Sequence, residues 1–169
     1  MTRRLPLLPV AVGPLLVAVT TAMAVAVTAC GNDSPDTRQE AVAERGREVM
    51  PFDLEATTHR FTSVADGLVQ TVVADNPNDE TQVDLVRSHL RAEASRFERG
   101  DFDDPARIHG EKMPGLARIR NHAGRIAVTY RSITGGGEIS YRTADPDLVD
   151  ALHGWADAQT SDHGDHATY

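Results

Sequence analysis

Residues 57–74 read TTHRFTSVADGLVQTVVA, and this stretch decides the fold. Two runs rich in β-branched residues, 57–64 and 68–74, lie on either side of Ala65-Asp66-Gly67. An Asp-Gly pair between two such runs predicts a β-hairpin. Residues 79–99 then change to helical spacing, and one stripe collects the apolar side chains Val83, Val86, Leu90, Ala94 and Phe97. The predicted order is therefore a hairpin followed by a helix.

A second hairpin and helix are predicted further along the chain. Residues 125–130 and 138–143 alternate apolar and polar side chains on either side of a glycine turn at 135–137. Asp145-Pro146 then begins a helix that extends to about Gln159, since proline suits the first helical turn. We therefore expect an α+β fold, in which two ββα units form a four-stranded antiparallel sheet with both helices on one face.

The connector between the two units, residues 101–115, is rich in proline and glycine. A connection of this length in a small domain is usually functional or disordered. We expect an ordered loop, because the apolar side chains of Phe102, Ile108, Met113 and Leu116 can hold it against the core. His109 would then lie on a fixed backbone beside Gly110, which makes it the leading candidate for a functional side chain.

The N-terminal residues are typical of an export signal. Arg3 and Arg4 precede an uncharged apolar run that ends at Ala29, and Val27-Thr-Ala-Cys30 resembles a bacterial lipobox. Acyl chains on Cys30, the only cysteine, would anchor the protein to the extracytoplasmic face of the membrane. Plain secretion and an uncleaved membrane span are the alternatives. The predicted organisation is a signal peptide at 1–29, the lipidated cysteine and a flexible tether at 30–48, and an α+β domain at 49–169. Residues 38–49 could form a short helix, but nothing in the sequence requires one.

Charge and cysteine content exclude other classes. A net charge of −8 argues against a nucleic-acid partner, which needs a basic surface. A single cysteine excludes an internal disulfide framework. No glycine-rich phosphate loop and no Gly-x-Ser-x-Gly elbow is present in the sequence.

Histidine is the residue type that points to a site, since the chain has seven histidines. Imidazole is a common ligand of zinc and copper and a base near neutral pH. Two histidines have a carboxylate four residues later in a predicted helix, which places each pair on one helical face. The candidate metal ligands are His59, His89, Glu93, His109, His153, Asp157 and His163.

Each candidate also has a purely structural interpretation. The pairs His89–Glu93 and His153–Asp157 could be surface pairs, and His59 could be a core histidine bonded to backbone. His122 is expected to stabilise a helix C-terminus, and His163 could belong to a solvated tail with His166. His89 and His153 lie on opposite flanks of their stripes, so they could face each other only if the two helices packed in parallel.

Several strings of the chain resemble a family of small exported bacterial proteins and lipoproteins without assigned activity. They include Thr57-Thr-His59-x-Phe61, His89-Leu-x-x-Glu93, Ile108-His109-Gly110, Met113-Pro-Gly-Leu116 and Leu152-His153-x-Trp155. The resemblance covers about residues 50–166 and implies that the recurring histidines of the family correspond to His59, His89, His109, His153 and His163. Members are sometimes labelled aspartate carbamoyltransferase, but the chain has no Ser-Thr-Arg-Thr-Arg string for carbamoyl phosphate, so the motifs do not support that activity.

Three functions are compatible with these observations. The leading hypothesis is a membrane-anchored domain that binds a transition metal or a small ligand through its histidines. The alternative is a cell-surface module that binds another protein, of unknown identity, without a metal. A third hypothesis is a hydrolase in which His109 is the base and Glu93 or Asp157 orients it.

Overall fold

The computed structural model describes residues 35–164 and 167–168. The predicted signal peptide and Cys30 lie outside the described residues. Within the described ranges, no helix combines the length and the apolar character that crossing a membrane requires.

The sheet confirms the α+β prediction and adds a short fifth strand. Its order is β3-β4-β2-β1-β5, and neighbouring strands are antiparallel except for the parallel pair β1–β5. The two hairpins join through β2 and β4, with Val72 opposite Gly137. The strands are β1 (Thr57–Val64), β2 (Gly67–Ala74), β3 (Ala127–Ile133), β4 (Gly136–Arg142) and β5 (Ala167–Thr168).

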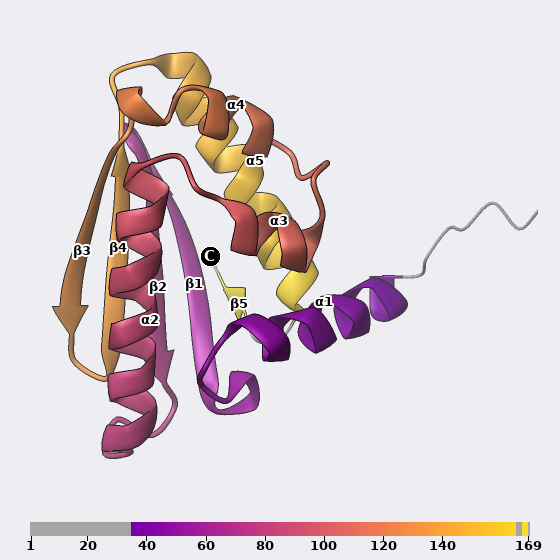
Figure 1. The fold of residues 1–169 in the computed structure, drawn as a ribbon, viewed down its shortest axis with the longest axis vertical. Helices are drawn as coiled ribbons and strands as arrows, with labels where there is room; N and C mark the ends of the chain where they lie inside the picture. The colour runs from indigo at the N-terminus through magenta and orange to yellow at the C-terminus, as the bar shows by residue number, and fades with distance from the viewer. Residues whose placement is uncertain (1–34, 165–166, 169) are drawn as a thin grey trace, which may run out of the picture. The chain divides into compact units, whose positions relative to one another are not determined.

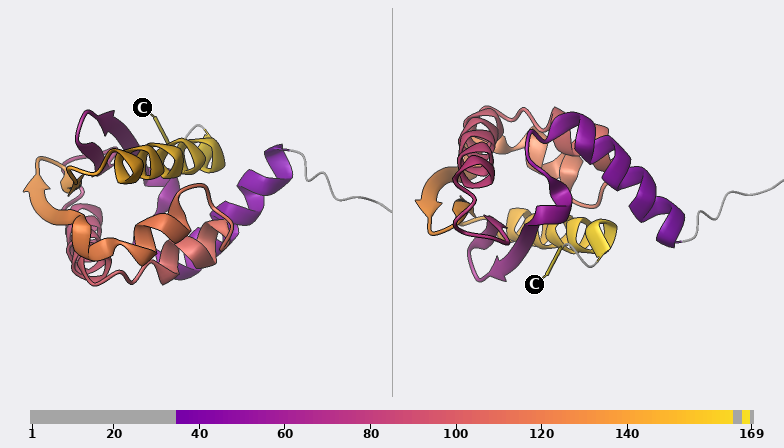
Figure 2. Two further views of the ribbon diagram at one scale, coloured as in Figure 1. Left: turned by 90° about the horizontal axis from the view of Figure 1, so that it is seen from above. Right: turned by 90° about the horizontal axis from the view of Figure 1, so that it is seen from below.

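The long helices lie on one face of this sheet (Figures 1 and 2). Helix α2 packs against β2, β3 and β4, whereas α5 packs against β1 and β2. The shorter α3 lies within the connector and α4 follows it, and α1 contacts both α3 and α5. The helices are α1 (Pro35–Val49), α2 (Glu80–Glu98), α3 (Asp103–His109), α4 (Leu116–Asn121) and α5 (Pro146–His163), with 3-10 turns η1 (Leu54–Ala56) and η2 (Ala123–Arg125).

Both long helices begin at the residues that the sequence predicts. The side chain of Asp79 accepts a hydrogen bond from the backbone N–H of Gln82, and the side chain of Asp145 accepts one from the backbone N–H of Asp147. Each cap satisfies a backbone donor that the first helical turn leaves free. Since α2 follows β2 and α5 follows β4, and β2 and β4 are antiparallel, α2 and α5 run in opposite directions (Figure 1).

The core lies between the sheet and the helices. Trp155 of α5 and Tyr141 of β4 are fully buried, with ring centroids 5.7 Å apart. Phe97 at the end of α2 stacks on Phe102, with centroids 4.5 Å apart and planes 10° apart. This contact holds the start of the connector against the core, as the sequence predicts, although residues 103–109 of the connector form the helix α3.

Two boundaries differ from the sequence prediction. Residues 30–48 were expected to form a flexible tether, but Pro35–Val49 form α1, whose Val42 is 1% exposed. Helix α1 is held largely by hydrogen bonds from its polar side chains rather than by an apolar stripe. Such hydrogen bonds produce no periodic pattern of apolar residues in the sequence. Helix α5 extends past Gln159 to His163, so His163 ends a helix and does not belong to a solvated tail.

Candidate functional site

A small enclosed cavity lies between the sheet and the helices α2, α3 and α5. It offers about 40 Å³ to the centres of water-sized molecules. Because one water needs roughly 10–15 Å³ by this measure, the space corresponds to about three waters. Its polar lining comes from β1, β2, α2, α3 and α5 and consists of His59, Gln70, His89, Glu93, Asp104, His109, Gln159 and His163.

Three of these histidines form a continuous group, which we call the histidine trio: His59, His109 and His163. The ring centroid of His163 lies 5.1 Å from that of His59 and 5.0 Å from that of His109. His59 and His109 are buried, and His163 is half-buried. The trio therefore gathers imidazoles from β1, α3 and the last turn of α5 at one end of the cavity.

His109 is oriented by a buried carboxylate. The Nδ1–H of His109 donates to Oδ2 of Asp162 at 3.0 Å, and Arg38 of α1 donates to both Asp162 oxygens at 2.5 and 2.6 Å. The Asp162 contact fixes the tautomer in which Nε2 of His109 keeps its lone pair. Burial lowers the pKa of His109 despite the neighbouring carboxylate, so the ring is neutral at neutral pH. Burial also opposes ionisation of Asp162, but the hydrogen bonds from His109 and Arg38 outweigh it and lower the pKa of that carboxyl.

Helix α1 reinforces this arrangement from outside. Its Arg45 donates from Nε to the backbone oxygen of Ile108 at 2.5 Å, and Arg38 donates to the backbone oxygen of His109 at 3.3 Å. Both acceptors lie in the last turn of α3, where carbonyl groups lack helical partners. The backbone of His109 is thereby held between α1 and the end of α5.

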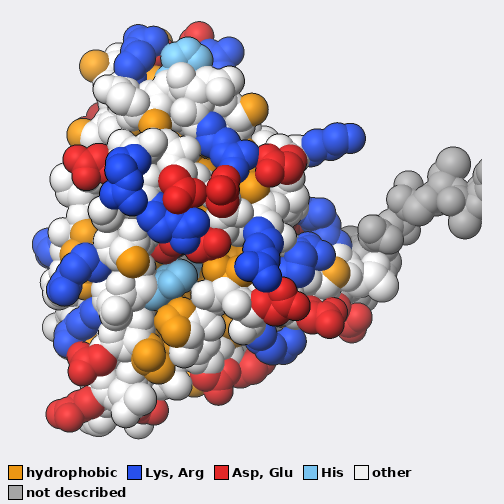
Figure 3. Space-filling view, viewed as in Figure 1, with side chains coloured by type: hydrophobic (Ala, Val, Ile, Leu, Met, Phe, Trp, Pro, Cys, Tyr) orange, Lys and Arg blue, Asp and Glu red, His pale blue; other side chains and the backbone are white. Residues whose placement is uncertain are grey.

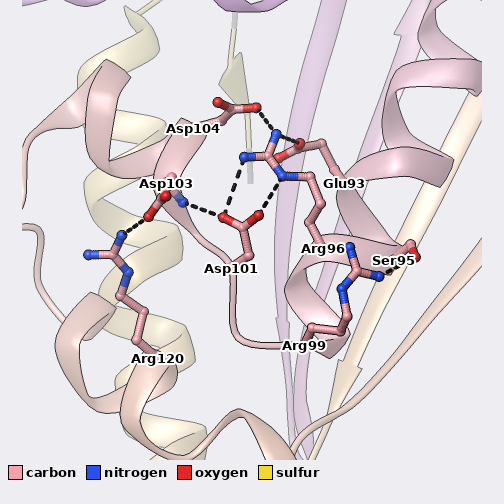
Figure 4. A network of polar contacts seen from close by, with 8 residues as sticks. All are labelled: Glu93, Ser95, Arg96, Arg99, Asp101, Asp103, Asp104 and Arg120. Carbon is pink, nitrogen blue, oxygen red and sulfur yellow. Dashed lines mark hydrogen bonds and ion pairs between the residues drawn. The ribbon is translucent and has the colours of Figure 1, made fainter.

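The cavity lining also contains a carboxyl group that resists ionisation. Glu93 of α2 is 5% exposed and lies 3.2 Å from Arg96, which also bonds Asp101 and Asp104 (Figure 4). Burial, reinforced by the negative charge of Asp104, raises the pKa of Glu93 to about 8, and the Arg96 charge offsets this only in part. Glu93 is therefore mostly protonated at neutral pH.

His89 lies one helical turn before Glu93 and lines the same cavity. Its ring meets Phe52 edge-on, with centroids 5.5 Å apart. Burial lowers the pKa of His89, although the negative charge of Asp104 acts in the opposite direction. His89 is thus a neutral imidazole beside the carboxyl side of the cavity.

The indole of Trp155 adds a buried donor to the lining. Its Nε1 is inaccessible to solvent and has no hydrogen-bond partner among residues 35–164 and 167–168. Gln70 is held nearby by Tyr141, whose hydroxyl donates to Oε1 of Gln70 at 2.8 Å. A buried N–H without a partner costs about 1–3 kcal/mol, so a polar occupant of the cavity would recover part of that energy.

The cavity brings together five of the seven predicted ligands: His59, His89, Glu93, His109 and His163.

His153 and Asp157 are the predicted site residues that the structure places elsewhere. Nε2–H of His153 faces the backbone oxygens of Val64 and Gly67, at 3.0 and 2.9 Å, and so pins α5 to the first hairpin. Asp157 is exposed. The physical reason is the opposite direction of α2 and α5, which places His153 at the turn between β1 and β2 and away from His89.

The remaining histidines have other positions. His122 is exposed and its Nδ1–H donates to the backbone oxygen of Arg118 at 3.0 Å, which agrees with the predicted role at a helix C-terminus. His166 lies outside the described residues.

Sequence reasoning missed Asp162, Arg38 and Asp104. Asp162 immediately precedes His163 in the string Ser161-Asp-His-Gly164, but the carboxylate was sought four residues from a histidine in the same helix. Asp162 instead orients His109, which is 53 positions away. Only the fold brings these two residues into contact, so no local spacing could have revealed the pair.

Charged side chains of both signs cover much of the face of the molecule that Figure 3 shows. Figure 3 shows a histidine side chain at the surface beside hydrophobic side chains, below a group of interspersed acidic and basic side chains. Ion pairs such as Arg107 with Glu48 at 3.0 Å join the elements around the connector. Much of the local charge is therefore neutralised in pairs.

No group of three or more His, Cys, Asp or Glu side chains surrounds a metal position among the described residues as the side chains stand. No protein-family model, curated protein or solved structure matches this chain. The resemblance to the family of exported proteins therefore stays a prediction from the sequence.

Proposed function

We propose that the chain is an extracytoplasmic domain, anchored by a lipid on Cys30, that binds a small ligand in the histidine-lined cavity. One observation supports this most strongly: four histidines and a glutamic acid from β1, α2, α3 and α5 line one enclosed space. The location rests on the sequence of the first thirty residues.

Packing alone gives no reason for such a lining. Moving a polar group from water into the interior costs free energy unless it finds a partner, and a lining of apolar side chains would avoid that cost. Here the described part of the chain places His59, Glu93 and His109 at 5% exposure or less around an enclosed space. Polar groups arranged around a cavity are the usual composition of a small-ligand site.

The size and charge of the cavity limit the ligand. Room for about three waters excludes nucleotides and sugars, unless the helices move. With His89 and His109 neutral and Glu93 mostly protonated, the lining offers nitrogen lone pairs and hydrogen-bond donors. A transition-metal ion or a polar molecule of a few atoms suits these groups.

The proposal is tested by thermal shift on the full chain in detergent micelles, with Zn²⁺, Cu²⁺, Ni²⁺, acetate, phosphate and imidazole as separate probes. We expect at least one probe to raise Tm in a saturable manner. Val72→Ile, which adds a methyl group at the cavity wall, should weaken that effect several-fold. Val73→Ile, on the other face of the same strand, is the matched control and should leave it unchanged. If none of the probes raises Tm, the proposal is wrong.

A second candidate function, hydrolysis with His109 as general base, is favoured by one contact. The sequence hypothesis named Glu93 or Asp157 as the orienting group, whereas Asp162 occupies that position. A carboxylate on Nδ1 leaves Nε2 to accept a proton from water. Hydrolysis of p-nitrophenyl acetate by the full chain, lost in His109→Gln and retained in His122→Gln, would support this function. Equal rates in the two variants would contradict it.

A further inference from the structure

We propose that the ligand of the cavity is a divalent transition-metal ion of the Zn²⁺ or Cu²⁺ type, bound by the histidine trio, with Asp162 as the group that positions His109. This inference rests on the proposed function, because it assigns the ligand class and the coordinating residues of the same cavity. It also separates the trio from His89 and Glu93, which line the cavity without binding the metal.

The distances between the imidazole rings of the trio agree with coordination of one shared metal ion. Zinc–nitrogen bonds of about 2.0–2.1 Å in tetrahedral geometry place the centroids of two bound imidazoles roughly 5 Å apart. The separations of 5.1 Å between His59 and His163 and 5.0 Å between His163 and His109 match that value. Two of the three ring pairs of the trio, both of which include His163, therefore lie at the separation that shared coordination requires.

The contact between His109 and Asp162 also supports a metal ligand role for His109. Histidine ligands commonly donate their other ring N–H to a carboxylate, which fixes the tautomer and strengthens the nitrogen as a ligand. Asp162 makes this contact at 3.0 Å and is itself held by two bonds from Arg38. Asp162, held by Arg38, therefore keeps the ring of His109 in one orientation.

The cavity beside the trio has space for the metal ion and a further ligand. Three protein ligands leave a fourth position of a tetrahedral ion open, as in zinc sites that bind water or a further small ligand. The space of about 40 Å³ beside the trio has room for an ion and a bound water. The rings of His59 and His163 must turn about their Cβ–Cγ bonds to point at one position, since no metal-binding group is preformed among the described residues.

Other contacts of His89 and Glu93 separate them from the metal. The ring contact of His89 is with Phe52 at 5.5 Å, and Glu93 is bonded to Arg96. Moving Glu93 toward the trio would break the hydrogen bond that Oε1 of Glu93 accepts from Arg96. These contacts tie the two side chains to Phe52 and Arg96 rather than to the trio.

The experiment measures metal binding by the full chain in detergent micelles, with Zn²⁺ and Cu²⁺ as probes in separate titrations. We expect one equivalent of metal, and a Kd raised at least 100-fold in His59→Gln, His109→Gln and His163→Gln. Asp162→Asn should raise Kd by about 10- to 100-fold, as expected for a carboxylate that orients a metal-binding histidine. The control variant His122→Gln, at an exposed histidine bonded to the backbone of Arg118, should bind as the wild type does.

A second measurement does not depend on the folding of any variant. The electron paramagnetic resonance spectrum of Cu²⁺ bound to the wild-type chain should show hyperfine coupling to three imidazole nitrogens. Coupling to one nitrogen or none would overturn the assignment, as would a loss of affinity in His89→Gln equal to that in His163→Gln.

The outcomes for the two proposals differ. If acetate, phosphate or imidazole raises Tm while neither metal binds, the metal inference is wrong and the proposed function stands. If none of these probes binds, both are wrong.

Discussion

Replacing Glu93 by glutamine should make the stability of the protein less dependent on pH. A pKa of about 8, against an ordinary value of 4.5, means that the folded state binds a proton more tightly than the unfolded state. The free energy of unfolding therefore falls as pH rises from about 4.5 to 8. Above pH 8 the full cost of ionising the buried carboxyl is present.

The magnitude follows from the same two pKa values. Each tenfold difference in proton affinity corresponds to about 1.4 kcal/mol, so the cost reaches about 3 kcal/mol at pH 7 and about 5 kcal/mol above pH 9. These figures are upper bounds, because a buried site relaxes around a charge. Glutamine has the shape of protonated glutamic acid and can donate to Asp104 as that form does. Glu93→Gln should therefore exceed the wild type in stability by an amount that grows with pH, from under about 1 kcal/mol at pH 5.

The assay is urea unfolding at pH 5, 7 and 9, followed by the fluorescence of Trp155, the only tryptophan. The histidines with lowered pKa values destabilise the fold at acid pH in both proteins, so their effect cancels in the difference. Glu98→Gln, an exposed glutamate of the same helix, is the control and should show no such trend. Parallel pH profiles for wild type and Glu93→Gln would refute the claim that Glu93 is protonated in the folded protein.

Three further substitutions test other parts of the fold. Asp162→Asn should lower the free energy of unfolding by about 2 kcal/mol at pH 7, measured with urea. Because the pKa of Asp162 is lowered in the folded state, the difference between variant and wild type should vanish as pH falls below the ordinary value of 3.8. A difference that stays constant with pH would contradict the ion pair. Gly115→Ala should lower the free energy of unfolding by about 3 kcal/mol, since φ of Gly115 is +75° and a Cβ would collide with the backbone oxygen of Ala151. The control Gly124→Ala should leave the stability unchanged. Equal Tm values for the two variants would argue against this geometry. Val42→Ala should lower the free energy of unfolding by about 2 kcal/mol, because Val42 is buried. An unchanged Tm would mean that α1 is not packed on the domain and behaves as a flexible tether.

The parts of the fold with strong periodicity could be predicted from the sequence. The hairpin around Asp66-Gly67 and the apolar stripe of α2 depend on contacts within a few dozen residues, and both are confirmed. Helix α1 could not be predicted in the same way. It buries Val42 and otherwise docks through Arg38 and Arg45, whose acceptors lie far along the chain.

The sequence predicted only part of the site, because the remainder also depends on contacts between distant parts of the chain. The enrichment in histidine suggested a shared pocket, and His59, His89, His109 and His163 do line one cavity. The spacing of His153 and Asp157 resembles that of His89 and Glu93, so spacing alone could not separate the two pairs. Only the direction of α5 relative to α2 decides which pair reaches the cavity.

The cavity depends on contacts between distant parts of the chain. Arg38 in α1 and Asp162 in α5 are 124 positions apart, and between them they hold His109 of the connector. Such contacts are slow to form, because a long loop must close before they contribute any energy. A chain still bound to the ribosome lacks the pocket until the last turn of α5 has been released. Occupancy would thus stabilise only the finished fold, and the ligand could not act as a nucleus for folding.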